Sequence, residues 1–335
     1  MNAMSQVNYT LTACVGSIIA FASRWGGGVP FSALDIGGLT VFVNYSRQFS
    51  RPINELAQQV TNIMSALAGA ERVFNVMDET EEIDDGKKRV LDKVHGDVLV
   101  EGVTFGYNPD KTILKDVSIF AHPGQKIALV GSTGAGKTTI TNLITRFYNI
   151  NKGKITIDGV DIKDISLECL RENIAMVLQD LFTGTIMENI RYGRLSATDE
   201  EVRQAAKTSC ADMFIKNMPE GYDTMLKGDG SNLSQGQRQL LNIARAALSK
   251  APILVLDEAT SSVDTRTEKH INEGMDALME DRTTFVIAHR LSTIRNADAI
   301  MVLENGEIIE RGTHEELLEK KGRYFELYTG LKELD

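Results

Sequence analysis

The stretch Gly131–Thr138, Gly-Ser-Thr-Gly-Ala-Gly-Lys-Thr, constrains this chain more than any other. It follows an apolar run at 126–130 and precedes a segment at 139–144 that is typical of a helix. This is the pattern G-x-x-x-x-G-K-[ST] in its strand–loop–helix setting. Glycines let successive backbone N–H groups point at one phosphate chain, and the following helix adds the positive end of its dipole. The pattern predicts a nucleoside triphosphate site rather than an ordinary glycine-rich turn.

The residue types in this loop have chemical roles in binding a triphosphate. Lys137 brings a mobile positive charge to the outer phosphates, and the Thr138 hydroxyl is a suitable ligand for Mg²⁺, which keeps waters and phosphate oxygens as its other ligands. The residues predicted to bind the nucleoside triphosphate here are Gly131, Ser132, Thr133, Gly134, Ala135, Gly136, Lys137, Thr138 and Thr139.

The length and charge of the chain limit the number of domains and the kinds of partner that it can have. Its 335 residues suggest about two domains. A net charge of −10 argues against a nucleic-acid partner, and we expect none. The cysteines, at 14, 169 and 210, form no CxxC motif and are predicted to be reduced thiols.

The N-terminal part is unusually apolar. Between residues 7 and 45 the only formal charges are Arg24 and Asp35. A glycine-rich loop with Trp25 separates apolar runs at 7–22 and 36–45. Because a membrane helix needs roughly 20 apolar residues, both runs are marginal. Two membrane helices and a buried helical hairpin of a soluble protein both remain open on these residues alone.

A long amphipathic helix is predicted next. Apolar residues recur at steps of three and four at 56, 60, 63, 67, 70, 74 and 77. If 36–77 is one helix, it is about 60 Å long, which suits a helix that crosses a bilayer and continues into the cytosol. Arg47 and Arg51 follow the second apolar run, as a cytoplasmic exit requires.

A charged linker at 78–97 then leads to a separate domain over 98–330. Short apolar strands alternate there with helical segments, which predicts an α/β fold with a largely parallel sheet. The predicted strands cover 98–105, 117–120, 126–130, 155–159, 253–256, 284–288 and 300–303.

Two carboxylates end one of these strands. The apolar run 253–256 leads directly into Asp257 and Glu258. Beside a phosphate-binding loop, Asp257 is positioned to hold Mg²⁺ and Glu258 to polarise an attacking water. The pair therefore predicts triphosphate hydrolysis.

A third motif, Asn232-Leu233-Ser234-Gln235-Gly236-Gln237, opens a helix a little over twenty residues before Asp257. Here the sequence resembles the ATP-binding cassette (ABC) ATPases, with their LSGGQ signature. The resemblance implies a P-loop NTPase fold with an antiparallel β subdomain and a helical subdomain. It also implies that Ser234, Gly236 and Gln237 bind, in trans, the ATP held by the loop of an opposite subunit.

Other positions of the ABC pattern are matched in order over roughly 97–330. Tyr107 corresponds to the aromatic that stacks on adenine, and Gln179 to the glutamine that senses Mg²⁺ and the attacking water. Asp264 lies in a segment like the D-loop, which crosses the dimer interface. His289 corresponds to the switch histidine. The resemblance thus implies Glu258, His289 and Gln179 as catalytic residues, and Thr138, Gln179 and Asp257 around the metal.

The stretches 45–53 and 68–74 resemble the last transmembrane helix of ABC exporters and its cytoplasmic extension. Residues 1–77 are therefore expected to be the end of an all-α transmembrane domain. The resemblance implies the C-terminal fragment of a half-transporter, although a genuine two-helix product is an alternative. It also implies a multi-pass plasma-membrane protein with a cytoplasmic nucleotide-binding domain.

The resemblance to ABC exporters implies that the chain is the ATPase of a transporter. Its partner is a second half-transporter, in a homodimer or a heterodimer, and its cargo is a drug-like small molecule, a lipid or a peptide. A soluble cassette protein of translation or DNA repair is a competing class, as is a regulatory half that does not hydrolyse ATP. The acidic balance disfavours the former, and the presence of both Glu258 and His289 disfavours the latter.

Two positions depart from the ABC exporter pattern. Gln235 replaces a glycine of the signature, which leaves open whether the backbone needs glycine there. The segment 226–231 lacks the glutamate of the exporter X-loop, which puts the usual contact between the cassette and the coupling helix in doubt.

Overall fold

The computed structural model describes residues 10, 14, 36–79, 89–108, 110–177, 180–228, 230–257, 265–287 and 291–332. The chain divides into two compact units, Met1–Ile83 and Asp84–Asp335.

In its described residues the first unit contains one long helix, α2 (Ile36–Met77), with the bounds that the sequence pattern suggested. It runs through Pro52, and Arg51 Nε lies 2.9 Å from Glu55 Oε1 on its surface. Its apolar stripe, including Leu56, Val60 and Leu67, is exposed. Apart from Thr10 and Cys14, the apolar run at 7–22 lies outside the described residues. Among the helices that the structure describes, none is both long and apolar enough to cross a membrane.

The second unit is built on a six-stranded sheet with strand order β12-β11-β3-β10-β9-β6. The strands β11 (Ala299–Glu304), β3 (Lys126–Gly131), β10 (Thr283–Ile287), β9 (Ile253–Asp257) and β6 (Ile174–Val177) run parallel to one another. Only β12 (Glu307–Gly312) is antiparallel to its neighbour in this sheet. The central strands are continuous apolar runs because helices and a second sheet cover both faces.

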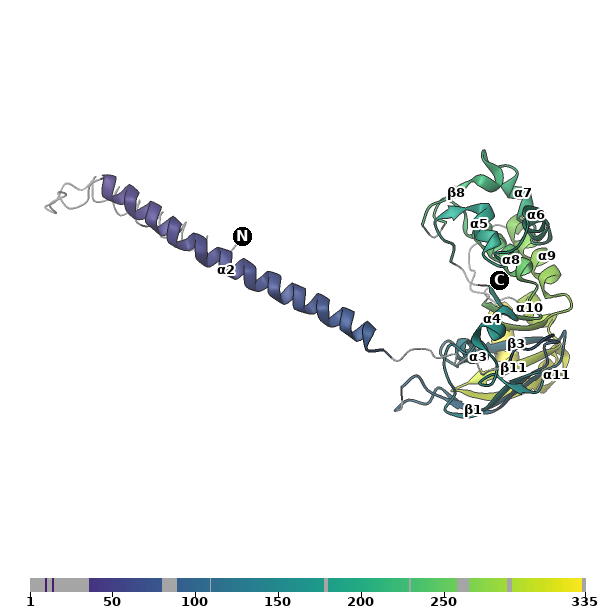
Figure 1. The fold of residues 1–335 in the computed structure, drawn as a ribbon. Coiled ribbons are helices and arrows are strands. Elements are labelled where there is room, and N and C mark those ends of the chain that lie inside the picture. Colours follow the sequence, from purple (N-terminus) through teal and green to yellow (C-terminus); the bar gives the residue numbers. More distant parts are fainter. Residues whose placement is uncertain are drawn as a thin grey trace. The chain divides into compact units, whose positions relative to one another are not determined.

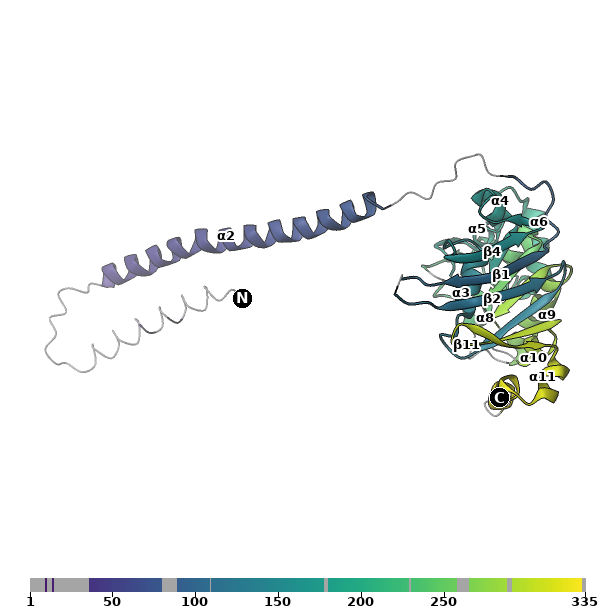
Figure 2. The same ribbon diagram turned by 90° about the horizontal axis from the view of Figure 1, so that it is seen from below.

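A four-stranded antiparallel sheet packs beside it, in the order β2-β1-β4-β5 (Figure 2). It consists of β1 (Val98–Phe105), β2 (Leu114–Ala121), β4 (Lys152–Ile157) and β5 (Val160–Asp161). In β1, buried residues largely alternate with more exposed ones. The buried side chains of these strands share one core with α3 (Lys137–Ile144), α4 (Leu167–Glu172) and the parallel sheet. This core supports the phosphate-binding loop from below.

Helices gather at the other end of the unit (Figure 1). They are α5 (Ile186–Arg191), α6 (Asp199–Thr208), α7 (Asp212–Ile215) and α8 (Gln235–Ser249), with the 3₁₀ turn Gly221–Asp223 and a hairpin of β7 (Gly184–Thr185) and β8 (Met225–Leu226). We call residues 180–250 the helical lobe. With α9 (Thr265–Met279) it forms a second core. The C-terminal helices are α10 (Leu291–Arg295), α11 (His314–Lys320) and α12 (Arg323–Lys332).

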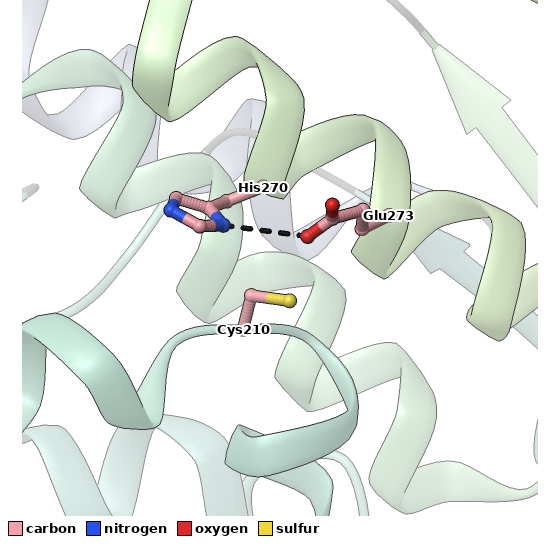
Figure 3. A group of neighbouring side chains, drawn as sticks. All are labelled: Cys210, His270 and Glu273. Carbon is pink, nitrogen blue, oxygen red and sulfur yellow. Dashed lines mark hydrogen bonds and ion pairs between the residues drawn. The ribbon is translucent and has the colours of Figure 1, made fainter.

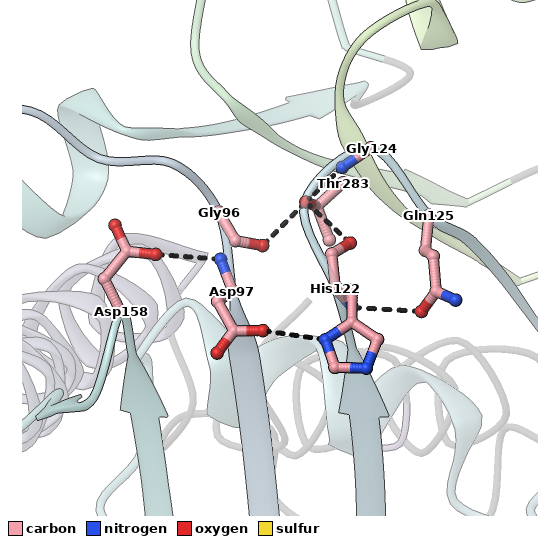
Figure 4. Close-up of polar contacts among 7 residues, drawn as sticks. All are labelled: Gly96, Asp97, His122, Gly124, Gln125, Asp158 and Thr283. Carbon is pink, nitrogen blue, oxygen red and sulfur yellow. Dashed lines mark hydrogen bonds and ion pairs between the residues drawn. The ribbon is translucent and has the colours of Figure 1, made fainter.

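A fully buried hydroxyl joins the two sheets. Thr283 begins β10, and its Oγ1 donates to the carbonyl of Gly96 at 2.6 Å and accepts from the N–H of Gly124 at 3.1 Å (Figure 4). A Cβ on Gly96 would lie 2.7 Å from this oxygen. The start of the antiparallel sheet is therefore fixed to β10 through Thr283.

Candidate functional site

The loop between β3 and α3 requires glycine at two positions. A Cβ on Gly131 would collide with the carbonyl oxygen of Leu303 in β11. Gly136 has φ +107°, and a Cβ there would lie 2.5 Å from Leu114 Cδ2. Because any side chain at either position would push the loop off the strands below, the glycines let it lie close to the sheet.

Lys137 is held in place by the loop itself. Its side chain is only 8% exposed, and Nζ donates to the carbonyls of Gly131 at 2.6 Å and Ser132 at 3.0 Å. Burial lowers the pKa of Lys137, while the nearby carboxylate of Asp257 opposes that shift. Two of the three ammonium hydrogens are thus committed, and the third remains for an anion.

A cavity of about 600 Å³ opens at this loop. Thr133, Gly134, Gly136, Lys137, Thr138 and Thr139 line it, together with Asp257 at the end of β9. Of the predicted loop residues, Gly131, Ser132 and Ala135 are not part of this lining, and Ala135 is buried in the core instead. A volume in this range suits a small-molecule ligand, and the donors at the helix N-terminus suit its phosphates.

Two segments that sequence reasoning missed complete the wall. Lys111 and Lys115 come from the loop before β2 and from β2 itself, and Asn305 and Gly306 form the turn between β11 and β12. The N–H of Lys115 donates to the carbonyl of Gly306 at 2.8 Å, which joins these segments. Among the described residues, the cavity lining therefore has three lysines and one carboxylate, which favours an anionic ligand.

Tyr107 lies beside the same loop. Its ring is 43% exposed, and its hydroxyl donates to Thr139 Oγ1 at 3.3 Å. The ring meets Phe105 and Tyr148 edge to face, with centroids 5.0 and 4.8 Å apart. Tyr148, 47% exposed, is a second aromatic at this position that the sequence motifs did not mark.

Four predicted residues, Gln179, Glu258, Asp264 and His289, lie outside the described residues. The strands before three of them, β6, β9 and β10, are parallel neighbours of one another in the sheet that contains β3. Parallel strands end at one edge of a sheet, which is where ligands bind in folds of this type. Asp257, exposed at the end of β9, is the described member of this group.

The signature motif forms the start of α8, outside the cavity lining. Ser234 is the N-cap, and its Oγ accepts from the N–H of Gln237 at 3.2 Å, while Gln237 Oε1 accepts from the N–H of Ser234 at 3.0 Å. Ser234 is exposed and Gly236 is buried. Gln235 is the first helical residue and has no positive φ, so this position does not need glycine.

Arg245 connects α8 with the segment that follows Gln179. Its guanidinium donates to the carbonyl of Asp180 at 3.1 Å and to the carbonyl of Asn189 at 2.9 Å. It also lies over the ring of Tyr192, 5.3 Å from its centroid, and burial lowers its pKa. A single arginine in an amphipathic helix carries no local signal for this role, and the sequence did not predict it.

The X-loop segment is tied to the same region. The N–H of Gly228 donates to Thr183 Oγ1 at 3.0 Å, and Arg238 donates to the carbonyl of Leu233 at 3.1 Å. Among the described residues of this loop, the Gly228 N–H thus provides a link to the residues before β7.

Comparison with known proteins decides the family of this domain. Residues 114–261 match the family model described as ABC transporter. The chain carries an ABC transporter ATP-binding cassette. The matched range contains the phosphate-binding loop, the signature motif and Asp257.

The cassette's relatives are exporters and proteins of similar type. The chain is 51% identical over 331 residues to the "Uncharacterized ABC transporter ATP-binding protein YfiC" of Bacillus subtilis, covering 98% of this chain and 53% of that one. It is 48% identical over 320 residues to the "Fatty acid ABC transporter ATP-binding/permease protein" of Mycobacterium bovis, covering 94% and 51%. It is 46% identical over 302 residues to the "ATP-dependent lipid A-core flippase" of Pseudomonas aeruginosa, covering 89% and 50%.

A solved bacterial Atm1-family ABC exporter with ATP bound matches the fold. Its TM-score is 0.72 at 38% identity, covering 97% of this chain and 56% of that one. The chain spans about half the length of the curated relatives it matches.

Proposed function

We propose that this chain is the ATP-binding and ATP-hydrolysing part of an ABC exporter that couples hydrolysis to transport across a membrane. The proposal rests on one observation: within one cassette, two separate groups of donors are suited to bind the phosphates of ATP. Lys137 and the loop amides line a cavity, while Ser234 caps an exposed helix N-terminus outside that lining. If a second subunit completes the ATP site, the two groups of donors on each cassette must be separate in this way.

The partner in this proposal is a second copy of the chain. Both halves of the composite site are complete here, since the loop, Asp257, Glu258, the signature and His289 are all present. Ser234 and Gln237 of one copy then face the ATP that lies on Lys137 of the other, with Asp264 near the interface. A heterodimer with a related half-transporter is the alternative.

Mg²⁺ fits the cavity because the Thr138 hydroxyl and the Asp257 carboxylate line it together, and oxygen ligands suit this ion. When bound, the ion neutralises charge on the phosphates. Lys137 donates to the terminal phosphate, Glu258 takes a proton from the attacking water, and Gln179 and His289 orient water and phosphate. The water oxygen bonds to the γ-phosphorus as the bond to the ADP oxygen breaks.

The cargo class follows from the relatives rather than from the cassette. The names of two relatives, a fatty acid transporter and a lipid A-core flippase, favour a cargo with acyl chains over a peptide or another small molecule. The proposed location is the plasma membrane, with the cassette in the cytoplasm.

The direct test measures ATP binding and Mg²⁺-dependent ATP hydrolysis by the full chain in detergent. Glu258→Gln is expected to bind ATP like the wild type while steady-state hydrolysis is abolished. Lys137→Met is expected to lose binding itself. Unchanged turnover in Glu258→Gln would refute the assigned role, and a wild-type chain that binds ATP without hydrolysing it would favour a regulatory half.

A further inference from the structure

Three residues with metal-binding side chains meet beside α9, away from the nucleotide cavity lining. Cys210 lies in the turn after α6, and His270 and Glu273 lie on α9 (Figure 3). One ligand atom from each lies within 4.8 Å of the other two. His270 Nδ1 and a carboxylate oxygen of Glu273 are 3.4 Å apart. We propose that Cys210, His270 and Glu273 form a zinc-binding site.

The backbone around the thiol is fixed by packing. Gly274 lets α9 come close to the turn, because a Cβ there would lie 2.8 Å from the carbonyl oxygen of Ser209. Ser209 is fully buried, and its Oγ donates to the carbonyl of Ala206. Cys210 has φ +60°, and its N–H donates to the carbonyl of Lys207 at 3.0 Å. The backbone of Cys210 is therefore held next to α9, while its side chain keeps its rotation.

The two α9 ligands lie on one face of the helix. Residues three apart in a helix are neighbours, so His270 and Glu273 approach each other without strain. Figure 3 shows the Cys210 side chain beneath this pair, on the neighbouring segment. The three donors thus come from two elements that converge on one point.

The spacing suits tetrahedral zinc. Zn²⁺ binds sulfur at about 2.3 Å and nitrogen or oxygen at about 2.0–2.2 Å, so neighbouring ligand atoms in a tetrahedral site are about 3.3–3.6 Å apart. The nitrogen–oxygen pair already has this separation, at 3.4 Å. The sulfur lies within 4.8 Å of the other two ligand atoms. It reaches the tetrahedral separation by a shift of at most about 1.5 Å, within reach of a side-chain rotation.

The donor set also selects the metal. Thiolate, imidazole and carboxylate together suit Zn²⁺, whereas Mg²⁺ and Ca²⁺ take oxygen ligands alone. Three protein ligands leave the fourth position for water. Binding forms a zinc–sulfur bond, and the thiol proton goes to solvent.

The charges around the group set the cost of releasing the thiol proton. Burial and the neighbouring Glu273 carboxylate raise the pKa of the Cys210 thiol, so zinc has to displace a proton that is held more tightly than usual. Lys269 lies 3.8 Å from Glu273 Oε1, but both side chains are at least half exposed and such pairs are weak. The other carboxylate oxygen faces His270.

A zinc ion here would join the helical lobe to α9. The helix begins at Thr265, directly after the segment that resembles the D-loop, and its inner face packs into the core of the lobe. The ion would add a cross-link at the rim of that core. Binding would therefore stabilise the cassette against unfolding.

The test uses the full chain in detergent, free of affinity tag and nucleotide, after removal of metal by a chelator. ZnCl₂ is titrated in competition with a chromogenic zinc chelator. The wild type is expected to bind one zinc tightly. Cys210→Ser and His270→Ala are expected to weaken binding by more than about 100-fold, since even residues behind the ligands change metal affinity 10–100-fold.

Matched controls carry the same substitutions elsewhere. Cys14→Ser removes an exposed thiol. His122→Ala removes a histidine whose Nδ1 lies 3.3 Å from Asp97 Oδ1, with no thiol in the contact. Both are expected to bind zinc like the wild type.

A second readout reports the thiolate directly. Co²⁺ added in place of zinc is expected to give a thiolate-to-metal charge-transfer band in the wild type and none in Cys210→Ser. Zinc at about 100 times its dissociation constant is expected to raise the wild-type Tm by about 5–10 °C. Zinc affinity that is unchanged in Cys210→Ser, or a wild type without the cobalt band, would overturn the proposal.

Discussion

Ser234→Ala tests two proposed roles of one hydroxyl, as the cap of α8 and as a donor to ATP. In the structure Ser234 Oγ accepts from the N–H of Gln237 at 3.2 Å and so caps α8. A hydroxyl can donate while it accepts, and in the proposed dimer Ser234 donates to the ATP phosphate on the partner's loop. The substitution removes both interactions and leaves the cavity around Lys137 untouched.

The two losses have different magnitudes. Removing an N-cap costs about 0.5–2 kcal/mol of folding free energy, and in a unit of this size 1 kcal/mol lowers Tm by about 2–4 °C. A hydrogen bond to a charged group contributes about 1.5–3 kcal/mol. A symmetric dimer contains two such contacts, so ATP-dependent association is expected to weaken by roughly 10²- to 10⁴-fold.

Thr198→Ala provides the matched control. Thr198 caps α6 through the same reciprocal pair of hydrogen bonds, with Glu201 in place of Gln237. Sedimentation of the full chain in detergent with a non-hydrolysable ATP analogue measures association, and calorimetry measures Tm. Both variants should lose similar thermal stability, and only Ser234→Ala should lose association. Equal association of the two variants would refute the role of Ser234 in trans.

Three further perturbations test the site and its support. Gly136→Ala should weaken binding of a fluorescent ATP analogue by at least about 100-fold, because its Cβ adds a clash with Leu114 to the backbone strain. Gly134→Ala, with open space around it, pays only the strain of about 1–2 kcal/mol and should weaken binding by at most about 30-fold; equal effects would contradict the packing argument. Thr283→Val removes the hydroxyl that pairs the buried Gly96 carbonyl and the exposed Gly124 N–H, and should lower the free energy of unfolding by about 1–3 kcal/mol in denaturant titrations. Thr284→Val, whose hydroxyl donates to the local carbonyl of Arg282, should cost less. Tyr107→Ala should weaken ATP binding by about 1–3 kcal/mol, because it removes the ring that stacks on adenine. Tyr107→Phe, which keeps a ring, should bind ATP within about threefold of the wild type. Unchanged ATP binding by Tyr107→Ala would show that adenine stacks elsewhere.

Features with a local signal were predicted from the sequence. The parallel strands β3, β9 and β10 are continuous apolar runs, and each leads into a motif residue or loop. The strand–loop–helix pattern fixed the position of Lys137, and the stripe of α2 indicated a helix that ends at Met77. In each case the residues that form the element also carry its pattern.

The rest of the site depends on contacts between distant segments. The turn at Asn305 and Gly306 reaches the cavity only because β11 pairs with β3 and the N–H of Lys115 bonds the turn. No pattern around residue 305 indicates this. The same holds for Arg245, whose partners Asp180 and Asn189 lie more than fifty residues away in sequence.

One doubt raised by the sequence has a structural answer. A glutamine in place of a signature glycine strains the backbone only if the backbone there is left-handed. Gln235 is the first residue of α8 with Ser234 as its cap, so an ordinary side chain fits. Sequence alone does not show where the helix begins relative to the motif.

Mixing two defective chains tests the central claim, that each ATP site combines the loop of one copy with the signature of another. Lys137→Met and Ser234→Ala chains with different tags are combined, and capture of one by the other is measured with and without the ATP analogue. A mixed dimer would contain one site with both defects and one intact site. We expect ATP-dependent capture in the mixture to be well above that of either variant with itself. Capture no greater than in the separate variants would contradict a shared site.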